Sequence, residues 1–205
     1  METTTNGIDV SHYQGDVQWE EVKGAGYGFA YAKCTEGTTY TDPRFKENWE
    51  GIGAAGLLRG AYHFYDSTSE GTAQAEHFLQ VMGAITTNDM APMLDLEVFK
   101  ASSVSEYQGE VLNFLKTVEQ ATGRKPIIYT APSFGDRYLN VPAFGEYPLW
   151  IAEYGVEAPR VPEAWKSEGK SWNIWQNNSK ASVPGINGNV DHDIFKGNLE
   201  GLLQL

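Results

Sequence analysis

The sequence predicts an α/β fold, an irregular TIM-like barrel with eight strands and fewer helices, about five. Two observations predict it. Short apolar segments typical of strands recur along the chain, and the early ones alternate with segments of helical spacing. This alternation implies parallel pairing with crossover connections, and eight short strands of this kind favour closure into a barrel. The helical signals weaken late in the chain, so a regular eightfold barrel is not expected.

The expected strands are short apolar stretches bounded by polar or turn-forming residues. They cover residues 7–11, 27–33, 58–64, 93–99, 126–130, 148–152, 173–176 and 189–195. The second one runs directly into a polar loop, so polar residues gather at its C-terminal end.

The expected helices cover residues 17–22, 42–56, 67–82, about 103–122 and a short helical or irregular piece around 134–139. Asp42 is a suitable N-cap and Pro43 suits the first helical position. Ser67 and Glu70 have the spacing of a capping box. Gly123 is expected to end the long helix.

Length and composition indicate a single domain over residues 1–205, with residues 1–6 as a disordered leader. Pro and Gly are spread out, and no low-complexity run or fixed-period repeat interrupts the pattern. Six Trp and eleven Tyr exceed what a minimal core needs. Most of them are explained as core residues, but aromatic platforms are also a common way to hold sugar rings.

The charge balance excludes one class of partner. The chain has 15 Lys and Arg against 27 Asp and Glu, a net charge of −12, so nucleic acid would be repelled. Cys34 stands alone and cannot form an internal disulfide. The N-terminal residues have neither the basic start nor the apolar run of a secretory signal, and no stretch is long enough to span a membrane. We therefore expect no membrane insertion.

The expected strand 93–99 carries two acids. Side chains alternate between the two faces of a strand, so Asp95 and Glu97 should lie on one face and Leu96 on the other. Two neighbouring carboxyls among apolar residues push their pKa values apart, which separates a proton donor from an anion. Glycosidic bond cleavage needs that division of roles. The alternative is a solvated strand end whose acids only keep it soluble.

Two further acids strengthen the functional interpretation. Asp9 and Asp191 also lie late in expected strands. Active sites of such barrels lie at the C-terminal ends of the strands. We therefore expect Asp9, Asp95, Glu97 and Asp191 to converge on one mouth of the barrel.

Several motifs together resemble the glycoside hydrolase family 25 lysozymes, also called Chalaropsis-type muramidases. They are residues 7–15 (GIDVSHYQG), 33–37 (KCTEG), 60–64 (GAYHF), 94–97 (LDLE), 148–152 (PLWIA) and 175–176 (WQ). The resemblance runs in the family's order from Gly7 to about Phe195. It implies an irregular eight-stranded barrel and hydrolysis of the β-1,4 bond between N-acetylmuramic acid and N-acetylglucosamine in peptidoglycan.

The resemblance also implies roles for individual residues. Glu97 resembles the general acid that protonates the leaving oxygen. Asp95 resembles the residue that stays ionised and polarises the N–H of the sugar's own 2-acetamido group in a substrate-assisted route. Asp9 and Asp191 match the family's other acidic positions. The positions that match residues lining the sugar groove are Tyr62, Tyr129, Trp150 and Gln176.

The sequence departs from the family pattern at a few positions, none of which removes a catalytic carboxyl. The family commonly has Ala at Cys34, an aromatic residue at Asn177, and Val-Asp-Leu-Asn over residues 190–193. Asn177 and Asp193 could alter groove contacts, while His192 should point away from the mouth if Asp191 points in.

Other functions fit the sequence less well. Cys34 could be a nucleophile with His12 or His63, but a small buried thiol is commoner. The four His residues show no paired metal spacing, so we expect no metal and no cofactor. A non-catalytic glycan-binding module would be expected to have lost an acid. A related hexosaminidase or chitinase-like activity is a further alternative.

The expected partners are peptidoglycan glycan strands, and we expect a monomer without a separate wall-binding module. The enzyme should act on the bacterial cell wall, outside the cell or in the periplasm. A muramidase without a signal would fit a phage endolysin or a toxin delivered by a contractile secretion device, with the phage origin slightly favoured.

Overall fold

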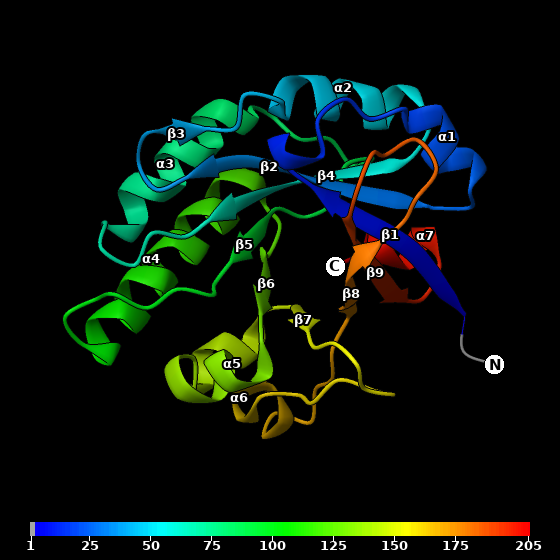
Figure 1. The fold of residues 1–205 in the computed structure, drawn as a ribbon. Coiled ribbons are helices and arrows are strands. Elements are labelled where there is room, and N and C mark those ends of the chain that lie inside the picture. The colour runs from blue at the N-terminus through cyan, green and yellow to red at the C-terminus, as the bar shows by residue number, and fades with distance from the viewer. Residues whose placement is uncertain (1–2) are drawn as a thin grey trace.

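The computed structural model describes residues 3–205 as one nine-stranded sheet that closes on itself (Figure 1). The strands follow one another in the order β1-β9-β8-β7-β6-β5-β4-β2-β3, and an additional pairing of β1 with β2 closes a ring of eight strands. The bounds are β1 (Thr4–Val10), β2 (Phe29–Glu36), β3 (Tyr40–Thr41), β4 (Leu58–Phe64), β5 (Met93–Asp95), β6 (Ile127–Thr130), β7 (Leu149–Ala152), β8 (Ile174–Ala181) and β9 (Val190–Lys196). The two-residue β3 is a hairpin addition to β2, so the predicted eight-stranded barrel is confirmed.

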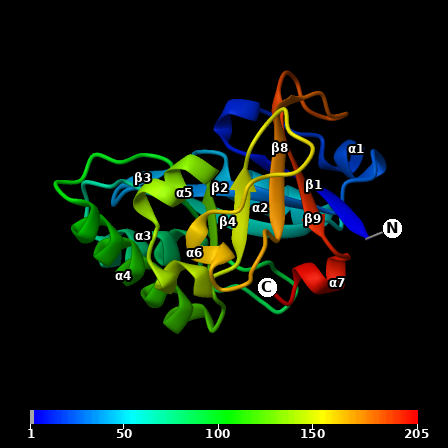
Figure 2. The same ribbon diagram turned by 90° about the horizontal axis from the view of Figure 1, so that it is seen from below.

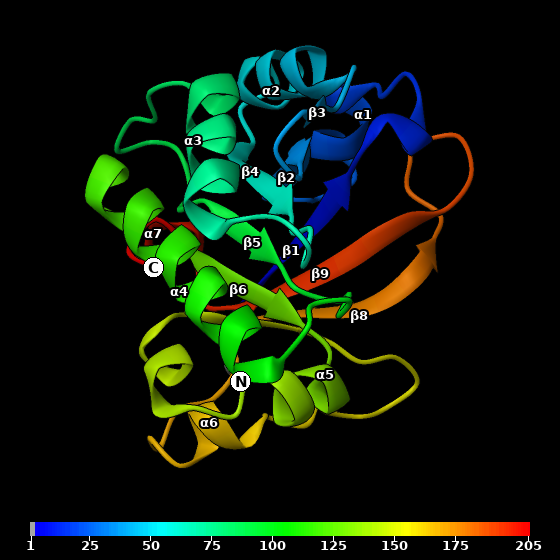
Figure 3. The same ribbon diagram turned by 90° about the vertical axis from the view of Figure 1, so that its left-hand side faces the viewer.

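Helices connect the early strands and nearly vanish from the late ones. The described residues form α1 (Trp19–Gly24), α2 (Phe45–Ala54), α3 (Gly71–Met82), α4 (Val104–Thr122), α5 (Pro132–Tyr138), α6 (Glu163–Lys166), α7 (Leu199–Leu202) and two 3-10 turns, His12–Gln14 and Pro142–Glu146. Since α6 and α7 have only four residues each, five longer helices remain, close to the number predicted. Figure 3 shows α2, α3 and α4 outside one half of the barrel, whereas β8 and β9 carry no helix.

The last strand runs against its neighbours. The pairs from β1 through β2, β4, β5, β6 and β7 to β8 are parallel, but β9 is antiparallel to both β8 and β1. Figure 2 shows β8 and β9 beside β1. The start of β9 therefore lies at the same end of the barrel as the C-terminal ends of the other strands. The expectation that Asp191 lies late in its strand is wrong, because Asp191 is the second residue of β9 and reaches that end through the reversal.

The helix boundaries follow local capping chemistry. Ser103 Oγ accepts a hydrogen bond from the Glu106 N–H (3.2 Å) at the start of α4, and Gly123 ends the helix with φ 69°. The expected capping box at Ser67 is wrong, because α3 begins only after Glu70 and Ser67 Oγ accepts from the Lys100 N–H instead (2.7 Å).

Apolar side chains form two layers. The outer layer packs the sheet against the helices and includes Ile8, Val10, Leu94 and Ile128. The inner layer fills the barrel and contains several aromatic residues: Phe29, Tyr31, Tyr62, Tyr129, Trp150 and Phe195. A side chain at Gly7 would collide with the Phe29 ring, the nearest atom being 2.2 Å from the added carbon, so glycine there makes room for the ring. Alternation along each strand thus decides which residues enter the barrel.

Two expected boundaries need correction. The expected strand 93–99 ends at Asp95, although the Leu96 N–H still donates to the Tyr129 carbonyl (2.9 Å), so Glu97 lies on the loop that leaves the barrel. The expected leader over residues 1–6 is too long. Thr4 already pairs with Lys196 in the sheet, and residues 1 and 2 lie outside the described part of the chain. Within residues 3–205, no helix has both the length and the apolar character that crossing a membrane requires.

Candidate active site

Acidic side chains from three parts of the barrel meet at the end where the parallel strands finish. Asp9 comes from β1, Asp95 from β5, Glu97 from the loop after β5, and Asp191 from β9. All four line one cavity of about 220 Å³. The expected convergence of these acids is therefore found in the structure.

Asp95 and Glu97 form the outer pair of carboxyls. Asp95 is only 7% exposed, whereas Glu97 is exposed at the rim, and their carboxyls are hydrogen-bonded to each other. Loss of solvent contact, then the negative charges of Glu97 and Asp9, raise the pKa of Asp95 well above its ordinary value. Loss of solvent around the Glu97 carboxyl, which faces the cavity, raises its pKa as well. Two carboxyls that interact in this way titrate as a pair, and the first proton is shared between them.

Asp9 anchors a chain of hydrogen bonds that crosses the barrel. Its Oδ2 accepts from Gln176 Nε2 (2.7 Å), and Gln176 Oε1 accepts from the hydroxyls of Tyr129 (2.8 Å) and Tyr154 (2.5 Å). Burial raises the pKa of Asp9 to about 6, against the lowering effect of hydrogen bonds from Gln176 and from the acids of β9. Tyr129 and Gln176 line the cavity, so the chain connects a buried acid to the cavity wall.

The acids of β9 lie next to Asp9. Asp191 is directly opposite Asp9 in the antiparallel pairing, and burial, followed by the charge of Asp9, raises its pKa to about 8. His192 points the other way, where its Nδ1 lies 2.7 Å from Asn177 Oδ1. Asp193, two residues after Asp191, enters the barrel again and is fully buried. The sequence singled out Asp193 only as a possible groove contact, although strand alternation from Asp191 was enough to place it inside.

Lys33 brings a cation to the acids. It lines the same cavity from β2, and its Nζ forms an ion pair with Glu36 (2.6 Å). Its charge lowers the pKa values of Asp95 and Glu97, against the larger effect of burial. Lys33 was missed among the candidate site residues, although it directly precedes the polar loop at the end of β2.

The expected groove residues do not all reach the cavity. Tyr62, Tyr129 and Gln176 line it. Trp150 does not, because it is fully buried in the inner core, where its Nε1 donates to Asp193 Oδ1 (3.2 Å). Trp150 thus supports the site from below.

The alternative nucleophile is not part of this cavity. Cys34 is fully buried in the outer core, and burial raises the pKa of its thiol, whereas a nucleophilic cysteine needs a lowered pKa. His63 is buried with Thr35 and Gln74 as neighbours, and burial lowers its pKa to about 3.

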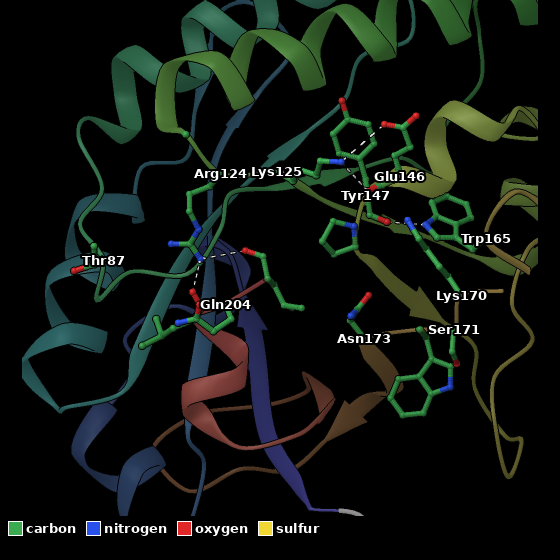
Figure 4. Close-up of a pocket in the computed structure, with 15 residues that line it drawn as sticks. Thr87, Arg124, Lys125, Glu146, Tyr147, Trp165, Lys170, Ser171, Asn173 and Gln204 are labelled. Atoms are coloured by element: carbon green, nitrogen blue, oxygen red, sulfur yellow. Dashed lines mark hydrogen bonds and ion pairs between the residues drawn. The ribbon is translucent and has the colours of Figure 1, made fainter. Parts of the chain in front are cut away.

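A larger cavity of about 790 Å³ lies at the opposite end of the barrel, next to the residues that precede β6, β7 and β8 (Figure 4). Its cations are held by backbone carbonyls. Arg124 donates to Leu203 O (2.9 Å) and Lys170 to Gly145 O (2.6 Å). None of the acids described above lines this cavity, and the acidic side chain that does, Glu146, is paired with Lys125.

A barrel whose mouth combines a buried and an exposed carboxyl with raised pKa values is an arrangement typical of glycoside hydrolases. The family model described as "Glycosyl hydrolases family 25" matches residues 8–186, and the chain belongs to this family.

Relatives and solved structures agree with this assignment. The chain is 38% identical to "Uncharacterized protein YegX" of Escherichia coli K12, over 97% of this chain and 72% of that protein. It is 36% identical to "Lysozyme M1" of Streptomyces globisporus, over 97% of this chain and 70% of that protein. The crystal structure of a bacterial lysozyme from Streptomyces coelicolor superposes with a TM-score of 0.92 at 36% identity, covering 99% of this chain and 97% of that one.

Proposed function

We propose that the chain is a peptidoglycan hydrolase, a lysozyme that cleaves the β-1,4 bond between N-acetylmuramic acid and N-acetylglucosamine. The observation that carries the proposal is the Asp95–Glu97 pair, in which a deeply buried carboxyl is hydrogen-bonded to one at the rim. Membership of glycosyl hydrolases family 25 and the likeness to lysozymes support the substrate.

The closeness of the two carboxyls supports a substrate-assisted route. Carboxyls that act as acid and nucleophile stand about 5 Å apart, and those that flank a water stand still further apart. The side chains of Asp95 and Glu97 are hydrogen-bonded to each other, so they lie too close together to hold a sugar carbon or a water between them. The internal nucleophile is then the 2-acetamido oxygen of the sugar.

Substrate binding would divide the shared proton. The 2-acetamido N–H donates to Asp95, which favours the ionised form of Asp95 and leaves the proton on Glu97. Glu97 then protonates the leaving oxygen as the acetamido oxygen attacks the anomeric carbon, and water later opens the resulting ring. Asp9 accepts a hydrogen bond from the amide of Gln176, and Asp191 lies next to Asp9, while Tyr62 and Tyr129 line the sugar site.

The test is digestion of purified peptidoglycan, followed by borohydride reduction and mass spectrometry of the new ends. Wild type should produce reduced muramic acid ends, and Glu97→Gln should not. Glu168→Gln is the matched control, since Glu168 is exposed near Gly145 at the other end of the barrel. Reduced glucosamine ends would make the enzyme a glucosaminidase. Binding to the sacculus without cleavage would favour the glycan-binding module.

The remaining expectations belong to the same proposal. The enzyme acts at the bacterial cell wall as a monomer, and the described chain is one catalytic unit. The net charge of −12 opposes approach to an anionic wall, so lytic activity should increase with salt until screening is complete. Light scattering during gel filtration tests the monomer.

A further inference from the structure

Asp193 is a buried acid without a counter-charge. It is fully buried, and its Oδ1 accepts from Trp150 Nε1 (3.2 Å). Among the described residues its Oδ2 has no N–H or hydroxyl partner, and the group it meets is the carboxyl of Asp9, to which it is hydrogen-bonded. Among residues 3–205, no Lys or Arg forms an ion pair with Asp9, Asp191 or Asp193. An isolated carboxylate in this position would be very costly, so a proton must be present.

The other groups around Asp193 cannot supply a positive charge. Asp9 faces it from β1 and Asp191 lies two residues before it on β9. Gln176 is its partner across β8, and Trp150 lies below it on β7. The remaining titratable neighbours are tyrosines, whose pKa values a negative charge on Asp193 would raise: Tyr27, Tyr31 and Tyr154.

We propose that Asp193 is a positioning residue that carries a proton and donates it in a hydrogen bond to Asp9. This inference rests on the proposed function, because the residue that Asp193 positions belongs to the proposed site. With the proton on Asp193, Asp9 is ionised and accepts a second hydrogen bond from Gln176 Nε2. The amide oxygen of Gln176 then faces the hydroxyls of Tyr129 and Tyr154 at the cavity wall.

The arrangement depends on pH. When hydroxide removes the proton, water is formed and two carboxylates face each other between the neighbouring strands β1 and β9, so their repulsion disturbs the hydrogen bond between Asp9 and Gln176. A neutral residue of the same shape that still donates to Asp9 would keep the arrangement at high pH. Asp193→Asn meets this requirement, because its amide nitrogen can donate to Asp9 while its oxygen accepts from Trp150. Asp193→Leu removes the charge and the donor together.

The first arm of the test measures stability and needs no activity. The pKa of Asp193 is raised in the folded state by burial and by the charges of Asp9 and Asp191. The stabilisation is therefore complete below the unfolded pKa near 4 and is lost as the pH rises through the folded pKa. The urea midpoint of Asp193→Asn should exceed that of wild type by a margin that grows from pH 4 to pH 9. A margin that is constant with pH would overturn the shared proton.

The second arm measures the pH profile of kcat/KM on a soluble peptidoglycan fragment. Asp193→Asn should retain activity on the alkaline side, with that limb shifted upward by about one pH unit or more. Asp193→Leu should shift the acidic limb upward, because Asp9 loses a donor that lowers its pKa. Coincident profiles of wild type and Asp193→Asn would overturn the positioning role. If no protein cleaves the substrate, the proposed function fails while the stability arm still decides where the proton lies.

Discussion

Buried acids occur in two regions of this molecule, and the fold treats them in opposite ways. Outside the barrel, Asp89 is 2% exposed and fully matched. Its Oδ1 accepts from Arg59 Nε (2.6 Å), and its Oδ2 accepts from the Thr86 N–H (2.8 Å) and hydroxyl (2.9 Å). Asp42, also 2% exposed, accepts from the Arg44 N–H and from His12. These acids stabilise the connections between strands and helices.

At the mouth of the barrel the acids are packed against one another. Asp95 Oδ1 and Asp193 Oδ2 have no N–H or hydroxyl partner in the described chain, and burial raises the pKa of Asp9, Asp95, Asp191 and Asp193. The fold thus provides hydrogen-bond donors for the buried carboxyls of Asp89 and Asp42 but not for every carboxyl oxygen at the mouth of the barrel. Unsatisfied groups gathered in and beneath one cavity cost stability, which is expected where a site is organised for a reaction.

The largest effect should come from Asp95→Asn. The neutral amide cannot stabilise the positive charge that develops on the acetamido nitrogen, so kcat should fall by about 10²- to 10⁴-fold. The same change removes a buried carboxyl whose pKa is raised because burial outweighs the charge of Lys33, so the urea midpoint at pH 7 should rise. Initial rates and urea denaturation check the two effects on one preparation. A variant that lost both activity and stability would contradict the contrast between the two regions.

Asp89→Asn should show the reverse. It breaks the ion pair with Arg59 and leaves the guanidinium without its anion, so the free energy of unfolding should fall by about 1–3 kcal/mol. Asp89 is not among the residues of the catalytic cavity, so kcat/KM should stay within twofold of wild type, about 0.4 kcal/mol. Loss of activity in a variant that remains folded would show that the two regions are coupled.

The sequence predicted the eight strands because each is a short apolar segment between clear turn signals. It predicted that Asp9 and Asp95 enter the mouth because both share the inward face of their strands. It could not predict the direction of β9, which depends on a connection without a helix, nor the end of β5 before Glu97. The alternation of side chains along a strand predicts which face of the sheet a residue occupies but not how deep in the barrel it lies. Trp150 was therefore expected to line the groove, whereas it is fully buried beneath it.

The pH dependence of stability should also separate the two regions. Burial raises the pKa of Asp9 to about 6 and that of Asp191 to about 8, above their unfolded values near 4. Groups of this kind stabilise the fold fully below the unfolded pKa, and the stabilisation is lost as the pH rises through the folded pKa. The free energy of unfolding should therefore decline from pH 4 to pH 9. Asp9→Asn should flatten the part of the curve between about pH 4 and pH 6, which denaturation at fixed pH values would reveal.

The smallest effect is expected for an acid in neither environment. Asp16 is exposed and forms an ion pair with Arg44, which also pairs with Glu47. Solvent screens this contact, and Arg44 keeps a partner when Asp16 is removed. Asp16→Asn should therefore change the free energy of unfolding by less than about 0.5 kcal/mol, with no effect on the pH profile of activity. Asp16 is the exposed reference for the two groups of buried acids. A larger change in its variant would mean that burial does not decide how much an acid of this chain contributes to stability, and the contrast between the mouth and the outer connections would no longer hold.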